Sequence, residues 1–111
     1  MAEARDTLAK IRDLADVRGA VIWRIGDAPA GDMGPGTGAE TPGLLSAGIG
    51  SLEHVVETVG LGQIEEVWFL TDAGQCMAIR LGLWQCVVVV DRSADVMPLR
   101  DAITAVLEGA D

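Results

Sequence analysis

The hydrophobic pattern between residues 66 and 91 predicts the centre of a β-sheet. Three apolar runs are separated by two short breaks, and they span Val67–Leu70, Cys76–Leu81 and Trp84–Val90. Both breaks contain glycine, which favours hairpin turns. Three strands joined by short turns form an antiparallel meander. The last run does not alternate with polar residues, so we expect a central strand covered by helices on both faces of the sheet.

Three other segments show the spacing of amphipathic helices. The first covers residues 3–17, and Gly19 is its expected left-handed stop. The second covers Thr41–Val59, with Thr41 itself as the candidate N-cap. The third covers Val96–Glu108 and begins after a candidate cap at Asp95. These helices supply the cover that the central strand needs.

A strand and a loop connect the first two helices. Residues 20–25 are apolar and predict the first strand, whereas residues 26–43 are rich in glycine and proline and predict a flexible loop. Within the loop, only Ala30–Met33 could form a short further strand. The segment Gly34–Gly38 lacks the Lys and Ser/Thr of a Walker loop and does not join a strand directly to a helix. We therefore expect no phosphate site there.

The second helix has an apolar arc that is wider than one sheet face usually covers. Leu45, Ile49, Leu52, Val56 and Val59 form one stripe, and Leu44, Ala47, Gly48 and Val55 widen it. Gly48 and Gly50 either allow another backbone to approach closely or mark an irregular helix start; the sequence favours neither. Trp68 and Phe69 are adjacent, so they face opposite sides of their strand. At a sheet edge, one of these aromatic rings lacks intramolecular cover.

Composition limits the class of protein. The chain has 111 residues, half of them apolar, which predicts one domain spanning residues 1–111 with a real core. The net charge is −9 and the eight Lys and Arg residues are scattered, so we expect neither nucleic-acid binding nor attraction to an anionic membrane. No apolar run is long enough to insert into a bilayer, and the charged N-terminal segment does not resemble a signal peptide. We expect a cytoplasmic location.

Residues that could carry out chemistry do not cluster. His54 is the only histidine, and the Cys, His and carboxylate spacing predicts no metal site and no cofactor. Glu65 and Glu66 are adjacent on a strand and point to opposite faces, so they do not form an acid–base pair. If Gly82 and the next residue form a two-residue turn, Cys76 and Cys86 also lie on opposite faces, which predicts free thiols. We assign no catalytic residue and expect a protein that is not an enzyme.

The element order and three local patterns resemble the roadblock / dynein light-chain family. The patterns are the Leu14 to Gly19-Ala-Val-Ile opening, the Gly-Leu-Gly-Gln-Ile-Glu-Glu-Val junction at Gly60–Val67, and the Leu99-Arg-Asp-Ala-Ile helix. The resemblance covers roughly residues 5–108. It implies an α+β fold in the order α-β-(β)-α-β-β-β-α, with a four- or five-stranded antiparallel sheet, one helix on one face and two on the other.

The resemblance also implies a dimer and a partner. Roadblock proteins form homo- or heterodimers through the middle helix and the following strand, and they typically bind or regulate Ras-like small GTPases. Carried onto this sequence, the dimer surface consists of Gly48, Leu52, Val55, Val56, Val59, Val67, Trp68, Phe69 and Leu70. The loop at residues 26–43 replaces most of the family's second strand, which puts a GTPase contact through that edge in doubt.

Two functions remain open at this point. The first is a non-enzymatic homodimeric adaptor that regulates a small GTPase in bacterial signalling or polarity. The second is a small-molecule sensor of profilin-, PAS- or GAF-like architecture. A sensor needs an apolar pocket with a few converging polar groups, and the sequence alone shows no such set.

Overall fold

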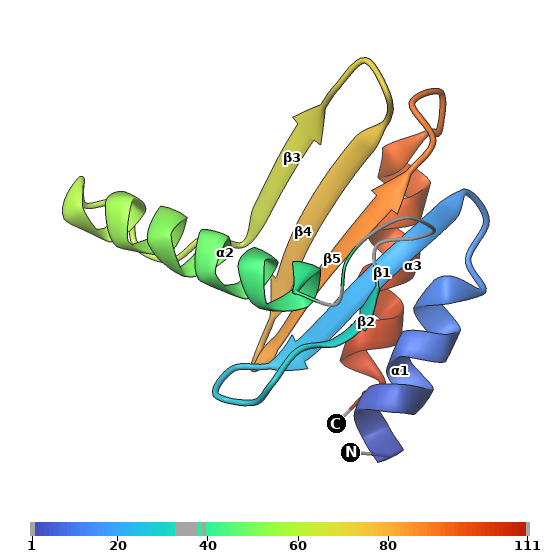
Figure 1. Cartoon of the computed structure of the whole chain (residues 1–111), viewed down its shortest axis with the longest axis horizontal. Coiled ribbons are helices and arrows are strands. Elements are labelled where there is room, and N and C mark those ends of the chain that lie inside the picture. Colours follow the sequence, from blue (N-terminus) through green and yellow to red (C-terminus); the bar gives the residue numbers. More distant parts are fainter. Residues whose placement is uncertain (1, 33–37, 39, 111) are drawn as a thin grey trace.

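The computed structural model describes residues 2–32, 38 and 40–110, in which three helices pack on one antiparallel sheet (Figure 1). The elements are α1 Ala2–Arg12, β1 Val17–Arg24, β2 Ala30–Asp32, α2 Thr41–Thr58, β3 Glu66–Leu70, β4 Gln75–Leu81, β5 Trp84–Val90 and α3 Val96–Glu108. The predicted α+β fold and element order are confirmed, and the optional strand is present.

The sheet has five strands in the order β2-β1-β5-β4-β3. The predicted meander is β3-β4-β5, and the predicted central strand, β5, lies between β1 and β4. Its register pairs Cys76 with Val89 and Ile79 with Cys86, as the two-residue turn predicts. Both cysteines are free, and they belong to different sides of the sheet.

Helices cover the two faces of the sheet unequally. On one face α1 and α3 pack against a large core that includes Ile11, Trp84, Val88 and Ile103. On the other face Val21, Trp23 and Val87 form a smaller core, against which the first half of α2 packs. Leu45 and Ile49, the α2 residues in this cluster, are only partly buried. The second face is therefore lightly covered, and α2 extends past the sheet edge formed by β3 (Figure 1).

The start of the chain departs from the prediction. Helix α1 ends at Arg12 rather than near residue 17, and β1 begins at Val17 rather than Ala20. The backbone N–H of Leu14 bonds to the carbonyl of Ile11, which tightens and ends the last turn. The left-handed residue is Asp16, with φ of 71°. Gly19 lies within β1 at a register shift and does not end the helix.

The predicted loop contains β2. This strand pairs with β1 through Ala30, Gly31 and Asp32, whereas Met33 and most of the Gly34–Gly38 segment lie outside the described residues. Gly31 has a φ of 113°, and a Cβ there would lie 2.2 Å from the backbone oxygen of Ala20. Glycine is therefore required at this pairing.

The ends of the other two helices agree only partly with the prediction. Thr41 is the first helical residue of α2; the N-cap is Glu40, whose side chain makes no capping hydrogen bond. Thr41 is therefore not the cap. Asp95 caps α3 as predicted, and its carboxylate accepts a hydrogen bond from the backbone N–H of Met97 at 3.3 Å. Within the described residues, no helix is both long and apolar enough to cross a membrane.

Candidate functional site

Strand β3 is an open edge of the sheet, with β4 as its only described strand neighbour. Two backbone hydrogen bonds, Arg80 N–H to Glu65 C=O and Thr71 N–H to Gly74 C=O, fix which residues pair toward β4. In an antiparallel ladder, successive residues direct their backbone N–H and C=O groups alternately toward the neighbouring strand and away from it. The backbone groups of Glu66, Trp68 and Leu70 therefore point away from the sheet and are available to another strand.

The side chains on this edge are apolar and exposed. Trp68, Phe69 and Leu70 are 44%, 52% and 66% exposed. Val67 packs with the α2 side of the sheet, so by alternation Phe69 lies on that side, while Trp68 and Leu70 lie on the α3 side. The sequence left one aromatic ring without cover, whereas the structure exposes both. An edge with large apolar side chains and open hydrogen-bonding groups is a typical association surface.

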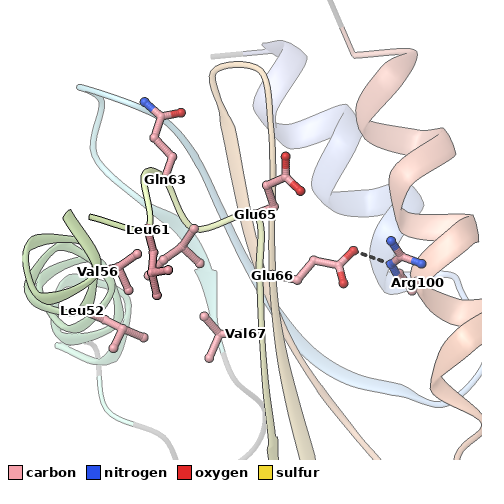
Figure 2. A pocket seen from close by; sticks show the side chains of 9 residues that line it. Leu52, Val56, Leu61, Gln63, Glu65, Glu66, Val67 and Arg100 are labelled. Atoms are coloured by element: carbon pink, nitrogen blue, oxygen red, sulfur yellow. Dashed lines mark hydrogen bonds and ion pairs between the residues drawn. The ribbon is translucent and has the colours of Figure 1, made fainter. Parts of the chain in front are cut away.

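Helix α2 continues this apolar surface. No described residue of the helix is buried, and Val55 and Val59 are 56% and 64% exposed. Leu52 and Val56 face β3 across an open hollow of about 640 Å³, which Val67 also lines (Figure 2). A helix that leaves its apolar arc half-covered lacks the packing that normally stabilises an amphipathic helix. We call the surface formed by the predicted dimer residues together with Leu61 the α2–β3 surface.

A polar rim borders the hollow. The carboxylate of Glu66 accepts a hydrogen bond from Nε of Arg100, which ties β3 to α3 (Figure 2). This hydrogen bond, followed by the Coulomb attraction of Glu66, raises the pKa of Arg100 above its ordinary value. Outside the lining of the hollow, Arg80 of β4 donates to Glu53 of α2 at 3.3 Å. These pairs hold α3 and α2 in place beside the exposed edge.

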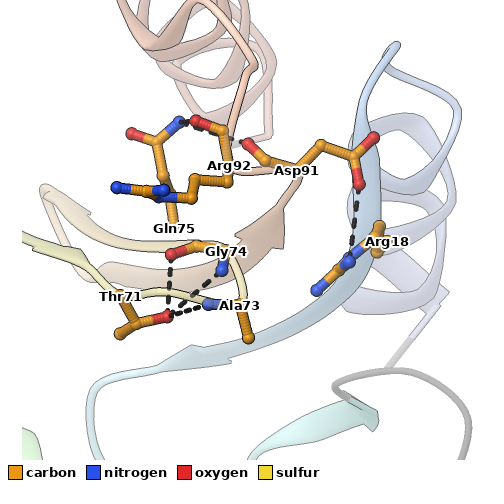
Figure 3. Close-up of polar contacts among 7 residues, drawn as sticks. All are labelled: Arg18, Thr71, Ala73, Gly74, Gln75, Asp91 and Arg92. Carbon is orange, nitrogen blue, oxygen red and sulfur yellow. Dashed lines mark hydrogen bonds and ion pairs between the residues drawn. The ribbon is translucent and has the colours of Figure 1, made fainter.

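The far end of β3 is fixed by its turn (Figure 3). The Thr71 hydroxyl donates to the Gly74 carbonyl at 2.9 Å and accepts from the Ala73 and Gly74 backbone N–H groups at 3.3 and 3.1 Å. The side-chain amide of Gln75 donates to the carbonyls of Asp91, Arg92 and Ala94 at 3.1 to 3.2 Å. The β3–β4 turn is thereby anchored to the segment between β5 and α3, so the edge is held in one position.

The structure brings together only some of the predicted interface residues. Leu52, Val56 and Val67 line one hollow. Gly48 is exposed, and a Cβ added there meets nothing within 4 Å, so no described backbone approaches it. Sequence reasoning missed Leu61, which is 75% exposed and also lines the hollow. The sequence signal was the position of Leu61 between two glycines, Gly60 and Gly62. Both glycines have positive φ in the structure.

The other candidate residues form no reactive site. His54 is exposed, and its carbonyl accepts a hydrogen bond from the Thr58 hydroxyl. Burial raises the pKa of Cys76 and raises that of Cys86 to about 12, which makes both thiols weak nucleophiles. In the described ranges, no group of three or more His, Cys, Asp or Glu residues could hold a metal ion.

Comparison with known proteins gives a likeness in structure only. No family model matches the sequence, and no curated protein matches it either. Solved structures do match across nearly the whole chain. MglB from Myxococcus xanthus is 12% identical, with a TM-score of 0.78 over 97% of this chain and 91% of its own.

Two further structures agree with this. The gliding protein MglB from Thermus thermophilus is 14% identical, with a TM-score of 0.73 over 98% of this chain and 86% of its own. A Roadblock/LC7 domain from Streptomyces avermitilis is 15% identical, with a TM-score of 0.65 over 91% of this chain and 88% of its own. The chain has the roadblock-type fold.

Proposed function

We propose that this chain forms a homodimer through the α2–β3 surface and that the dimer is a non-enzymatic adaptor that regulates a Ras-like small GTPase in cytoplasmic signalling. The observation that carries the dimer is the open β3 edge with its three exposed apolar side chains, Trp68, Phe69 and Leu70. In a single copy these side chains remain in water. A second copy offers both the apolar cover and the backbone hydrogen-bond partners.

The backbone geometry limits how two β3 strands pair. Within β3, only Glu66, Trp68 and Leu70 direct their backbone groups outward. A two-fold axis requires that every pairing between two residues also occurs in reverse. Antiparallel pairing centred on Trp68 satisfies both conditions, with each Glu66 opposite the second copy's Leu70. The two Trp68 rings then lie together on the α3 side. In this arrangement the two five-stranded sheets join into one.

The same arrangement accounts for the exposure of α2. The helix extends past β3 (Figure 1), so the α2 helices of two copies joined along β3 would meet on one face. Val55 and Val59, both more than half exposed, and the hollow lined by Leu52 and Val56 would then be covered. Burial of a valine or leucine side chain stabilises by about 1.5–3 kcal/mol.

The GTPase part of the proposal has a different support. The chain resembles the roadblock family in sequence pattern and has the fold of a Roadblock/LC7 domain and of two MglB proteins. Regulation of small GTPases is what that resemblance implies. The net charge of −9 favours a partner with a basic face. No catalytic residue is assigned to this chain, so any effect on GTP hydrolysis would come from ordering the partner's own residues.

A cysteine cross-link tests the dimer and its register. In a Cys76→Ala background, Trp68→Cys places two thiols opposite each other across the axis, with Cα atoms about 5.5 Å apart, which suits a disulfide. Phe69→Cys is the matched control, because Phe69 faces the second copy's Val67 instead of itself. We expect mild oxidation to give a covalent dimer with Trp68→Cys and little with Phe69→Cys. A monomeric mass at high concentration, or the reverse cross-linking pattern, contradicts the proposal.

A binding assay tests the partner. The purified chain is mixed with each Ras-like GTPase of its own cell, loaded with GDP or a GTP analogue, and affinity and hydrolysis rate are measured. We expect one GTPase to bind in one nucleotide state. Leu52→Asp/Val56→Asp should abolish binding together with dimerisation, while Leu83→Asp, at an exposed leucine in the β4–β5 turn, should preserve both. If the dimer forms but binds no GTPase, only the regulatory half of the proposal fails.

A further inference from the structure

A second, more enclosed pocket lies away from the α2–β3 surface. It has a volume of about 260 Å³ and is formed where the start of α1, the end of β1, the β1–β2 turn and the start of β5 come together. The residues lining it are Ala4, Arg5, Trp23, Arg24, Asp27, Ala28, Pro29, Ala30 and Trp84. Strand β2 is the sheet edge opposite β3. This pocket would therefore stay accessible in a dimer formed through β3.

Trp84, one of the residues that line this pocket, has an unpaired polar group. The side chain is 2% exposed, and its indole Nε1–H is buried with no acceptor among the described residues. Buried tryptophan N–H groups normally find an acceptor. Leaving such a donor unsatisfied costs about 1–3 kcal/mol. The position therefore favours a ligand that brings an acceptor.

Two cations and one anion line the same space. Arg24 lies directly across the β1–β5 ladder from Trp84, and its guanidinium carbon is 5.5 Å from the centre of the indole ring. Arg5 lines the pocket from α1, and Asp27 lines it from the turn. The described lining residues thus include one more positive than negative side chain, in a chain whose total charge is −9. Pro29 and the alanines provide an apolar wall.

We propose that this pocket binds a small organic carboxylate with a compact apolar body. The carboxylate accepts a hydrogen bond from the Trp84 indole N–H and pairs with Arg5, while the apolar body lies against Pro29. The pocket is slightly smaller than the roughly 300–1,000 Å³ typical of ligand pockets, so it suits a single ring or a short branched chain. A lone water, which occupies about 30 Å³, would leave most of the space unfilled. This inference does not depend on the proposed dimer or on the GTPase.

Indole resonances give a direct test with the intact chain. The three tryptophans give three Nε1–H signals in a ¹⁵N-correlated NMR spectrum, and Trp→Phe variants assign them. Sodium benzoate is the probe, benzamide is its uncharged counterpart, and sodium chloride controls for ionic strength. We expect benzoate to shift the Trp84 signal saturably at millimolar concentration and to leave the Trp68 signal in place. Benzamide should bind about tenfold more weakly, because it lacks the charge.

Variants on α1 separate a binding role from a structural one. Arg5 is exposed, so Arg5→Gln should leave the fold intact while weakening benzoate binding by about tenfold. Lys10→Gln removes an exposed charge from the same helix away from the pocket and should have no effect. Equal shifts with benzoate, benzamide and chloride, or no saturable shift of the Trp84 signal, overturn the proposal. Unchanged affinity in Arg5→Gln overturns it as well.

Discussion

At the scale of single residues, Cys86 shows how fully the α1/α3 side of the sheet excludes water. Its side chain is 1% exposed, in a cluster with Trp84 and Val88. Desolvation disfavours the thiolate and raises the pKa of Cys86 from 9.0 to about 12. Cys76, on the lightly covered face, is only partly buried, and burial raises its pKa as well. The burial of the two thiols thus reflects how fully each side of the sheet is covered by helices.

The Cys86 pKa predicts a loss of stability in alkali. Below about pH 9 the thiol is protonated in both states and contributes no pH dependence. Between about pH 9 and pH 12 the unfolded chain releases this proton and the native chain retains it, so stability falls by up to about 1.4 kcal/mol per pH unit. Urea unfolding across this range measures the slope. Cys86→Ala should reduce the dependence of the unfolding free energy on pH more than Cys76→Ala does. Equal slopes in the two variants would contradict the attribution of this dependence to Cys86.

At the scale of elements, α2 differs from the other two helices. α3 has a side-chain cap at Asp95 and buries Leu99, Ile103 and Leu107. α2 has neither a side-chain cap nor a buried residue, and it contains Gly48 and Gly50. Added Cβ atoms at both glycines meet nothing within 4 Å. The packing of a single copy therefore does not explain why α2 contains these glycines.

Alanine at each glycine distinguishes a packing role from an irregular helix start. Gly48→Ala and Gly50→Ala should each raise the free energy of unfolding by up to about 1 kcal/mol, because alanine is the better helix former. Only Gly48→Ala should also weaken the homodimer severalfold, if a second backbone approaches there. Urea unfolding and sedimentation equilibrium measure the two effects. If neither variant changes dimerisation, the glycines serve no interface.

At the scale of the whole molecule, negative charge and exposed apolar surface act against each other. A net charge of −9 makes two copies repel at low ionic strength. The β3 edge and the C-terminal half of α2 attract them through apolar burial. Salt screens the repulsion over about 8–10 Å at moderate ionic strength and leaves the apolar attraction in place.

Association should therefore appear in thermal unfolding. The melting temperature should rise with protein concentration, because the dimer is the folded state that mass action favours. At a fixed protein concentration, added salt should raise the melting temperature further, because it screens the repulsion between the two copies. Differential scanning calorimetry over a range of concentrations measures both effects. A melting temperature independent of concentration in the native chain, and equal to that of Leu52→Asp, would show that the folded unit is a monomer.

Sequence pattern predicted the elements well where local signals agreed. Turn residues delimited the β3-β4-β5 meander, and its two-residue turn set the register that separates Cys76 from Cys86. The end of α1 was predicted wrongly because Leu14 and Ala15 continue the helical spacing, although the chain turns at Asp16. The prediction of Thr41 as the α2 cap was wrong because it rests on residue type alone, whereas a cap depends on backbone geometry.

The surfaces were predictable to different degrees. The wide arc of α2 and the adjacent aromatic residues of β3 indicated exposed apolar surface, because too little sheet was available to cover them. The pocket beside Trp84 could not be predicted, since it combines residues 4–5, 23–30 and 84. No local pattern shows that Arg5 and Arg24 line one pocket with Trp84. Such a site becomes visible only when the topology places distant segments together.

The position of β5 also determines when the protein can fold. This strand is the middle of the described sheet, yet it follows the other four strands in the sequence and leaves the ribosome after them. Until residues 84–90 emerge, β1 lacks its longest ladder, and the apolar faces of α1 and α2 have no complete layer to pack on. The sheet therefore has no complete core until residues 84–90 have emerged, and the apolar β3 segment, which emerges before them, is exposed in the meantime to chaperones and to neighbouring chains.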